Sequence, residues 1–233
     1  MKLSDFKGVF TKTAATVLSV HNPHGDYFVV RLRPAQGVIW RPGEHAIFSM
    51  PGKAVSGRKW RAFSIASAPE ENKILIGTRT GKTPSSFKQA LVSLQAGDTV
   101  NVRGPFGWFV FQNNTSPVVL IAGGVGITPI RALLIRMSGG HEREATVIFT
   151  SHDYYLFRDD IAAITHPDER ITFHQTHEHK ETQALMDECT GQYGNSAYYY
   201  VSGSMKFIRS VKKHLRRAGI KGRRMINDPF IGY

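Results

Sequence analysis

The sequence predicts two domains, an antiparallel β-barrel followed by a doubly wound α/β domain, and three observations support this. Short β-prone segments separated by turn formers fill the first half, which is typical of a barrel or a sandwich. Strands and helices alternate in the second half, which favours a parallel sheet. The polar stretch QNNTS at residues 112–116 lies between the halves, so we expect domains at residues 1–112 and 116–233.

The first half contains short β-prone segments at residues 15–20, 26–33, 45–50, 61–67, 74–80 and 98–102. The stretches HNPHG, RPGE, PGKAVSG, APEEN and RGPFG are rich in turn formers and separate the strands. One helix is expected in this half. Thr83 would cap it, Pro84 would take the first helical position, and Phe87, Leu91 and Leu94 would form its apolar stripe.

The second half opens with a buried strand at residues 118–122, and the stretch IAGGVGITPIRALL follows at residues 121–134. Thr128 and Pro129 predict a helix start, because a hydroxyl can cap and proline suits the first position. The apolar stripe of that helix is Ile130, Leu133, Leu134 and Met137. Further strands are expected at residues 146–150, 171–175 and 197–203, and further helices at residues 156–164 and 205–217.

The glycines at residues 123–126 therefore lie in a strand-to-helix turn. Free N–H groups and the helix dipole at such a turn favour an anion, typically a phosphate. The alternative is a tight turn that needs glycine for its backbone angles and binds nothing.

Composition limits the classes of function. With 233 residues, 41% of them hydrophobic, the chain is globular, and no apolar run approaches the length of about 20 residues that a membrane span needs. The start lacks the apolar core of a signal peptide, so we expect a cytoplasmic protein without membrane insertion. The net charge of +12 suggests acidic partners. The single cysteine, Cys189, is expected to be a packing residue, so redox chemistry would need a bound cofactor.

Two further patterns are interpreted as structural. His174, His177 and His179 match no common zinc spacing, so no metal site is predicted. The basic segment at residues 206–224 has an apolar helical face and lacks the interleaved aromatic residues of a base-stacking platform. We therefore expect no nucleic-acid binding there, and interpret its cations as a solvated face that is available to an acidic protein.

The stretch RAFS at residues 61–64 combines an arginine, an aromatic residue and a serine on a predicted strand. Alternation places Arg61, Phe63 and Ile65 on one face, and Ser64 on the other. Such residues suit a flavin, because a guanidinium pairs with pyrophosphate and a hydroxyl can meet the edge of the ring system. An ordinary strand with a surface arginine is the alternative.

Taken with this stretch, a series of motifs in the expected order resembles the ferredoxin–NADP reductase-like flavoprotein family over nearly the whole chain. The matching segments are RPGE (41–44), RAFS (61–64), GKTPSSF (81–87), GPFG (104–107), the GxGxxP pattern of Gly124, Gly126 and Pro129, VSGS (201–204) and DPFIGY (228–233). The chain departs from the family pattern in two places. Phe63 replaces the commoner tyrosine, and Ser202 replaces a cysteine often found near the nicotinamide.

The resemblance implies an NAD(P)H-dependent flavoprotein oxidoreductase, in which hydride passes from nicotinamide to a bound flavin and electrons then pass to an acceptor. FAD is expected rather than FMN, and NADH or NADPH is the substrate. The implied catalytic residues are Ser64, Ser202 and Tyr233. The implied cofactor-binding residues are Arg61, Phe63, Ser64, Thr78, Gly81, Ser85, Ser86, Gly123, Gly124, Gly126, Thr128, Pro129, Ser151, Gly203 and Phe230.

The acceptor and the choice of nucleotide stay open in the sequence. An acidic ferredoxin or flavodoxin is one hypothesis for the acceptor. The alternatives are a diaphorase that reduces diffusible flavin, quinone or ferric chelates, and a non-catalytic flavin-binding subunit of a larger complex. Ser151, His152 and Arg158 could accept the 2′-phosphate of NADPH, whereas Asp153 could bind the ribose hydroxyl of NADH and repel that phosphate.

Overall fold

The computed structural model describes residues 8–140 and 143–228. The chain divides into two compact units after Val110. We call residues 8–110 unit 1 and residues 111–228 unit 2.

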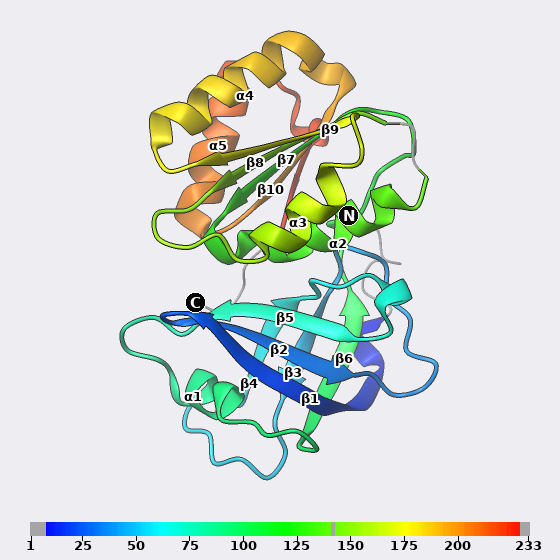
Figure 1. Ribbon diagram of the computed structural model, residues 1–233, viewed down its shortest axis with the longest axis vertical. Coiled ribbons are helices and arrows are strands. Elements are labelled where there is room, and N and C mark those ends of the chain that lie inside the picture. Colours follow the sequence, from blue (N-terminus) through cyan, green and yellow to red (C-terminus); the bar gives the residue numbers. More distant parts are fainter. Residues whose placement is uncertain (1–7, 141–142, 229–233) are drawn as a thin grey trace. The chain divides into compact units, whose positions relative to one another are not determined.

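Unit 1 is a curled antiparallel sheet of six strands in the order β4-β3-β6-β1-β2-β5 (Figure 1). Its elements are β1 (Lys12–His24), β2 (Tyr27–Arg33), β3 (His45–Ser49), β4 (Trp60–Ser64), β5 (Ile74–Arg79), α1 (Ser86–Val92) and β6 (Thr99–Phe106). Alternate side chains of the strands fill the core, as the period of two requires. Phe63 and Ile65 belong to this core together with Phe87 and Leu91 of α1.

Three predictions for unit 1 need correction. Strand β1 continues to His24 and β6 to Phe106, so residues predicted as turns pair as strand. Helix α1 begins at Ser86, and Ser85 rather than Thr83 is its cap, because the Ser85 hydroxyl accepts from the Lys88 N–H at 3.4 Å. Leu94 lies beyond the helix end. The sequence offers both the Thr83 and the Ser85 hydroxyl as caps, and the structure uses Ser85.

Unit 2 contains a parallel sheet of five strands in the order β11-β10-β7-β8-β9. The strands are β7 (Val118–Gly123), β8 (Ala145–Thr150), β9 (Ile171–Thr176), β10 (Tyr198–Ser202) and β11 (Met225–Asn227). The helices are α2 (Ile127–Ser138), α3 (Arg158–Thr165), α4 (His179–Tyr193) and α5 (Met205–Arg217). Sequence patterns predicted all of these except α4 and β11. Strand β11 has only three residues and an irregular burial pattern.

Helices cover both faces of the parallel sheet, with α4 and α5 on one face and α2 and α3 on the other (Figure 1). Ile208, Val211 and Leu215 of α5 pack into a core that also contains Cys189. Burial raises the pKa of the Cys189 thiol to about 11, so it is a packing residue, as the sequence predicts. Among the described residues, no helix is both long and apolar enough to cross a membrane.

Candidate functional site

In unit 1, Ser64 ends strand β4 directly opposite His45, the first residue of β3. Side chains at opposite positions of an antiparallel pair lie on the same face and close together. Both side chains are buried. The His45 ring contacts the Phe106 ring at a centroid distance of 4.4 Å. Burial in this apolar setting lowers the pKa of His45 to about 4, so its imidazole is neutral at pH 7.

A clamp of Arg41, Glu44 and Gly107 holds the His45 end of β3. The Glu44 carboxylate accepts from the Arg41 backbone N–H at 2.9 Å and from Arg41 Nε at 2.8 Å. Arg41 Nη2 donates to the Gly107 carbonyl at 3.1 Å. A Cβ atom on Gly107 would lie 2.9 Å from Nδ1 of His45. The RPGE and GPFG motifs therefore meet in space, and together they fix the imidazole beside Ser64.

Arg61 belongs to a group of cations beside helix α1. Its guanidinium carbon lies 5.4 Å from the centre of the Phe87 ring. Burial and the nearby Arg58 lower the pKa of Arg61, and burial together with Arg61 lowers that of Lys88. Cations held this close repel one another, so an anion placed among them would be stabilised. This is what a site for a phosphate requires.

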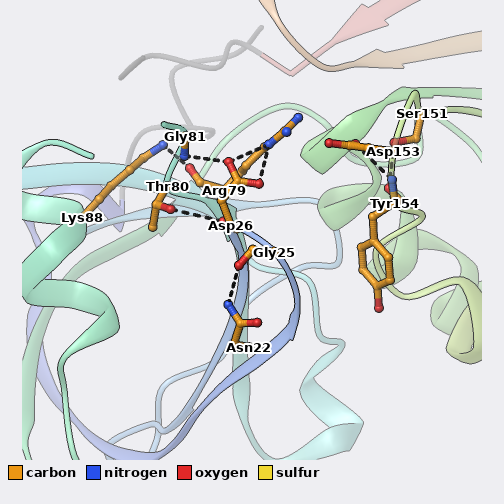
Figure 2. A network of polar contacts seen from close by, with 10 residues as sticks. All are labelled: Asn22, Gly25, Asp26, Arg79, Thr80, Gly81, Lys88, Ser151, Asp153 and Tyr154. Atoms are coloured by element: carbon orange, nitrogen blue, oxygen red, sulfur yellow. Dashed lines mark hydrogen bonds and ion pairs between the residues drawn. The ribbon is translucent and has the colours of Figure 1, made fainter. Parts of the chain in front are cut away.

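The segment after β5 was expected to bind the flavin phosphate through Gly81, Ser85 and Ser86, but its Gly81 N–H already has a partner within the protein (Figure 2). The Gly81 N–H donates to Oδ2 of Asp26 at 2.9 Å, so it is not free for a phosphate. The Ser86 hydroxyl accepts from the Ser56 N–H at 3.1 Å and keeps its own proton to donate. Of the predicted phosphate ligands in this segment, Ser85 and Ser86 therefore keep donor capacity in their hydroxyls, whereas the Gly81 N–H is committed to Asp26.

Thr78, another predicted cofactor residue, has a fully buried side chain in β5. Its hydroxyl has no hydrogen-bond partner among the described residues. A buried hydroxyl without a partner costs about 1–3 kcal/mol, so its retention needs a reason. A bound polar group is one such reason.

In unit 2, the order of the strands reverses between β7 and β10. The chain passes from β7 to β8 and β9 on one side, and then continues with β10 and β11 on the other. Ligands of open parallel sheets bind outside the carboxyl ends of the strands at this switch point. Ser202, the last residue of β10, pairs with Ala122 of β7, so it lies beside the glycine turn.

The glycines of the turn have distinct roles. Gly124 has φ +54° and open space where a Cβ would lie. A Cβ on Gly126 would lie 2.3 Å from the carbonyl oxygen of Ser202, and one on Gly123 would lie 2.9 Å from the Phe207 ring. Gly203, with φ +152°, is packed against the same ring. Close packing at the switch point therefore requires Gly123, Gly126 and Gly203, and only Gly124 leaves room for a ligand.

The predicted helix start is wrong in detail. A 3₁₀ turn at Gly124–Gly126 leads directly into α2, which begins at Ile127. Thr128 therefore lies inside the first helical turn, where its hydroxyl donates to the Val125 carbonyl at 2.9 Å instead of capping. Pro129 falls within the first turn, where its missing N–H leaves no bond unmade.

The Ser202 hydroxyl is fully buried and has no hydrogen-bond partner among the described residues. Among the described residues, each unit thus holds one orphaned hydroxyl, Thr78 in unit 1 and Ser202 in unit 2, at a position predicted to meet a cofactor. With the Arg61 cations and the open position at Gly124, these residues fit a phosphate-bearing flavin in unit 1 and a nicotinamide dinucleotide in unit 2.

The loop after β8 and the start of α3 contain the residues that left the choice between NADH and NADPH open in the sequence. Figure 2 shows Ser151, Asp153 and Tyr154 of this loop. The Ser151 hydroxyl is buried and donates to the Tyr154 carbonyl at 2.7 Å. Asp153 is exposed, and its Oδ1 accepts from the Tyr154 N–H at 3.0 Å. Arg158 forms an ion pair with Asp159 at 2.8 Å. Two of the groups proposed for a 2′-phosphate are therefore already engaged.

Two predicted site residues, Phe230 and Tyr233, lie outside the described residues. In the described part of the chain, no cluster of histidine, cysteine and carboxylate residues is arranged to hold a metal ion. His45, Asp26 and Lys88 were missed. His45 directly follows RPGE, but only strand pairing reveals that it faces Ser64.

Known proteins resemble this chain in sequence. The chain is 28% identical over 214 residues to a flavohemoprotein of Deinococcus radiodurans, covering 82% of this chain and 51% of the relative. It is 33% identical over 130 residues to the reductase component of propane 2-monooxygenase of Mycolicibacterium goodii, covering 52% and 35%. The chain thus spans about half or less of the length of these curated relatives. No protein-family model matches the chain.

Solved structures share the fold. The FAD/NAD-binding domain of a nitric oxide dioxygenase from Vibrio cholerae superposes with a TM-score of 0.75 at 19% identity, over 93% of this chain and 97% of that one. The cytochrome b5 reductase domain of Ulva prolifera nitrate reductase gives a TM-score of 0.75 at 18% identity, over 96% and 99%.

The chain is similar in sequence to flavohemoproteins and to reductase components, and it has the ferredoxin reductase-like fold. The predicted resemblance and the predicted fold class are therefore confirmed. In this ferredoxin reductase-like fold, unit 1 is the curled antiparallel sheet and unit 2 is the parallel α/β sheet.

Proposed function

We propose that the chain is an NAD(P)H-dependent flavoprotein oxidoreductase, with flavin bound by the domain of residues 1–112 and the nicotinamide dinucleotide by residues 116–233. The observation that carries this proposal is the glycine turn beside the orphaned Ser202 hydroxyl at the switch point of the parallel sheet. The cations around Arg61 support a phosphate-bearing flavin in unit 1. FAD is proposed rather than FMN.

When bound, the flavin would accept a hydride from the reduced nicotinamide and supply electrons to an acceptor. The chain would bind and orient the two groups. Arg61, with the hydroxyls of Ser85 and Ser86, would hold the flavin phosphate, while Ser64 would donate to the flavin ring edge. In unit 2, Gly124 would let the dinucleotide phosphates approach the backbone, and Ser202 would donate beside the nicotinamide.

The test is anaerobic mixing of the purified chain, loaded with FAD, with NADH or NADPH. We expect the flavin absorbance to bleach. A chain that binds neither FAD nor FMN contradicts the proposal. Retention of flavin without bleaching by either nucleotide would instead favour a non-catalytic flavin-binding subunit. Bleaching with rapid loss of flavin on dilution would favour a reductase of diffusible flavin.

We further propose that NADH is the preferred nucleotide. The Ser151 hydroxyl already donates to a backbone carbonyl, and Arg158 is paired with Asp159, so neither is free to bind a 2′-phosphate without giving up its partner. The carboxylate of Asp153 is exposed at the carboxyl end of β8, where it would repel that phosphate and accept from a ribose hydroxyl.

The kcat/KM ratio of NADH to NADPH tests this preference. We expect a ratio above about 10, and Asp153→Ser should lower the ratio about tenfold by removing the repulsive charge. Glu169→Ala is the control, because it removes an exposed carboxylate just before β9, at the amino end of that strand, whereas Asp153 follows the carboxyl end of β8. A wild-type preference for NADPH, or an equal change in both variants, would contradict the role of Asp153.

For the acceptor, we propose an acidic electron-carrier protein that docks on the exposed cations of α5. Residues 206–224 contain no Asp or Glu. Lys213, Arg216 and Arg217 are exposed, whereas Lys212 donates to Asn227 at 3.0 Å and is a poor candidate for docking. Opposite charge raises encounter rates by roughly 10–10³-fold, and salt screens this effect.

Reduction of an acidic ferredoxin should therefore be several-fold faster at low ionic strength than near 0.15 M, whereas reduction of a neutral quinone should hardly respond. Reversing Lys213, Arg216 and Arg217 to glutamate should abolish the difference. Lys12 and Arg103, exposed cations of unit 1, are the comparison set. If only their reversal abolishes the difference, the docking face lies elsewhere. Equal salt responses for the two acceptors would favour a diaphorase.

A further inference from the structure

Asp26 lies in the tight turn between β1 and β2, but its carboxylate serves a different part of unit 1 (Figure 2). Arg79 Nε donates to its two oxygens at 2.8 and 2.9 Å, and the Gly81 N–H donates to Oδ2 at 2.9 Å. The turn itself has other support, because the Asn22 amide donates to the Gly25 carbonyl at 2.8 Å. The carboxylate therefore connects the hairpin to the end of β5.

The backbone of Asp26 reinforces this connection. Its carbonyl accepts from the Thr80 N–H at 2.8 Å and from the Thr80 hydroxyl at 3.3 Å. The next residue of the hairpin, Tyr27, lies under the Arg79 guanidinium, with the guanidinium carbon 4.9 Å from the ring centre. Three consecutive residues at the end of β5, Arg79 to Gly81, are thus held against one hairpin turn.

The far end of the loop of residues 80–85 is tied to the same place. Lys88 of α1 is buried, and its ammonium donates to the Arg79 carbonyl (Figure 2). The Ser85 hydroxyl caps the Lys88 N–H. Both ends of the loop therefore meet at Arg79, which the Asp26 carboxylate holds in position.

Fixing a loop before binding matters energetically. Ordering one residue costs roughly 1–2 kcal/mol, and a loop that is already ordered does not add this cost to binding. Charge matters as well, because Arg61, Arg79 and Lys88 are cations in one small region, and Asp26 offsets part of their repulsion. Neutralising Asp26 would loosen the loop and increase the repulsion among these cations.

We propose that Asp26 is a positioning residue of the flavin site, which holds the loop of residues 80–85 so that Ser85 and Ser86 can bind the flavin phosphate. This inference rests on the proposed flavin site in unit 1. It assigns to Asp26 an effect on phosphate-bearing flavins in particular, because in the proposed site the loop would contact the phosphate and not the ring system.

The test compares the affinities of the purified chain for FAD and for riboflavin, which lacks phosphate, by quenching of flavin fluorescence. Asp26→Asn should weaken FAD binding about tenfold, the loss expected for a charge-assisted contact, and riboflavin binding less than twofold. Asp26→Glu keeps the charge and should recover part of the FAD affinity.

Asp98→Asn is the matched control. The Asp98 carboxylate also serves one backbone N–H, that of Gln95 at 2.9 Å, and one cation, Lys53 at 2.9 Å. Its side chain is 31% exposed, against 27% for Asp26. This variant should lose similar stability but change the affinity for either flavin less than twofold.

Arg79→Gln supplies a second variant, which removes the cation and leaves the bond between Asp26 and Gly81. It should show the same selective loss in smaller amount, and it decides the question if Asp26→Asn does not fold. If the wild-type chain binds no flavin, the proposed function and this inference fall together. If it binds FAD but these variants bind FAD as tightly, or lose riboflavin equally, only the inference falls.

Discussion

The loop of residues 80–85 in unit 1 and the glycine turn at Gly124–Gly126 in unit 2 invite comparison, because both connect a strand to a helix and both are proposed to meet a phosphate. In unit 2 the turn is held by backbone packing, with Gly126 against Ser202 and Gly203. In unit 1 the loop is held by side chains, chiefly those of Asp26, Arg79 and Lys88.

The difference shows that two segments with the same local sequence pattern can be held by different interactions, backbone packing in one and charged side chains in the other. One Thr-Pro pair lies in the loop of unit 1 and another lies just after the glycine turn of unit 2, and each pair predicted a helix start. A turn held by backbone packing has no room for a Cβ at Gly126 but is insensitive to side-chain charge. A loop built from ionised side chains has open space at Gly81, where a Cβ would meet no atom within 4 Å, but depends on charge.

The largest expected effect is a loss of stability on replacing Gly126, compared with a smaller loss on replacing Gly124. Gly126→Ala should destabilise unit 2 by about 3 kcal/mol or more, because its Cβ would lie 2.3 Å from a backbone oxygen. Gly124→Ala should cost only about 1–2 kcal/mol, the strain of an L-residue at positive φ. Chemical denaturation followed by circular dichroism measures both. All three tryptophans, Trp40, Trp60 and Trp108, lie in unit 1, so their fluorescence reports that unit separately.

Gly191→Ala is the control for these variants. Gly191 lies in helix α4 with no atom within 4 Å of an added Cβ, so alanine should stabilise by about 0.5–1 kcal/mol. Equal destabilisation by Gly124→Ala and Gly126→Ala would contradict the division of roles at the turn.

The next effect tests whether unit 1 is the acid-sensitive unit. The folded-state pKa of His45 is about 4, below its ordinary value of 6.5, so protonation favours the unfolded chain. The stabilisation from the neutral imidazole is complete above about pH 6.5 and is lost as the pH falls towards 4, by on the order of 2–3 kcal/mol. Tryptophan fluorescence during urea unfolding at several pH values measures it.

His45→Asn should flatten this dependence between pH 6.5 and 4, since the variant has no group there to titrate. The same denaturation series, followed in unit 2 by circular dichroism, should shift less. A variant that keeps the full wild-type slope would assign the acid sensitivity to other groups.

A third prediction concerns the rate at which NADH reduces the bound flavin. Ser64→Ala should slow flavin reduction by NADH about 10–100-fold, or about 1.4–2.7 kcal/mol, with flavin still bound. Stopped-flow absorbance measures the rate. Ser67→Ala is the matched control, because the Ser67 hydroxyl donates to the Lys73 carbonyl at 2.6 Å and has a structural role, so it should change stability and not the rate.

The smallest expected effects come from the two orphaned hydroxyls. Thr78→Val and Ser202→Ala remove buried groups without partners, so each variant should be as stable as the wild type or more stable by about 1 kcal/mol. Thr78→Val should weaken flavin binding, and Ser202→Ala should slow flavin reduction. Loss of stability in either variant would mean that the hydroxyl serves the fold.

Sequence reasoning reached most of the elements because their signals are local. The βα alternation, the apolar stripes of α2 and α5, and the packing role of Cys189 follow from periodicity and composition. The sequence predicted the helix starts less accurately. Thr83 and Ser85 are both possible caps of α1, and the 3₁₀ turn before α2 places Thr128 inside that helix. The short strand β11 carries too few residues to show a period.

What the sequence determined by itself is the fold class, the order of the motifs and the types of residue available to a flavin and a nucleotide, since these depend on neighbouring residues along the chain. Only the tertiary structure decided which partners those residues have. Strand pairing brings His45 opposite Ser64, the reversal of strand order brings Ser202 to the glycine turn, and a hairpin turn brings Asp26 to Gly81. Each contact joins residues at least 19 positions apart, and no local pattern encodes which distant side chain will arrive.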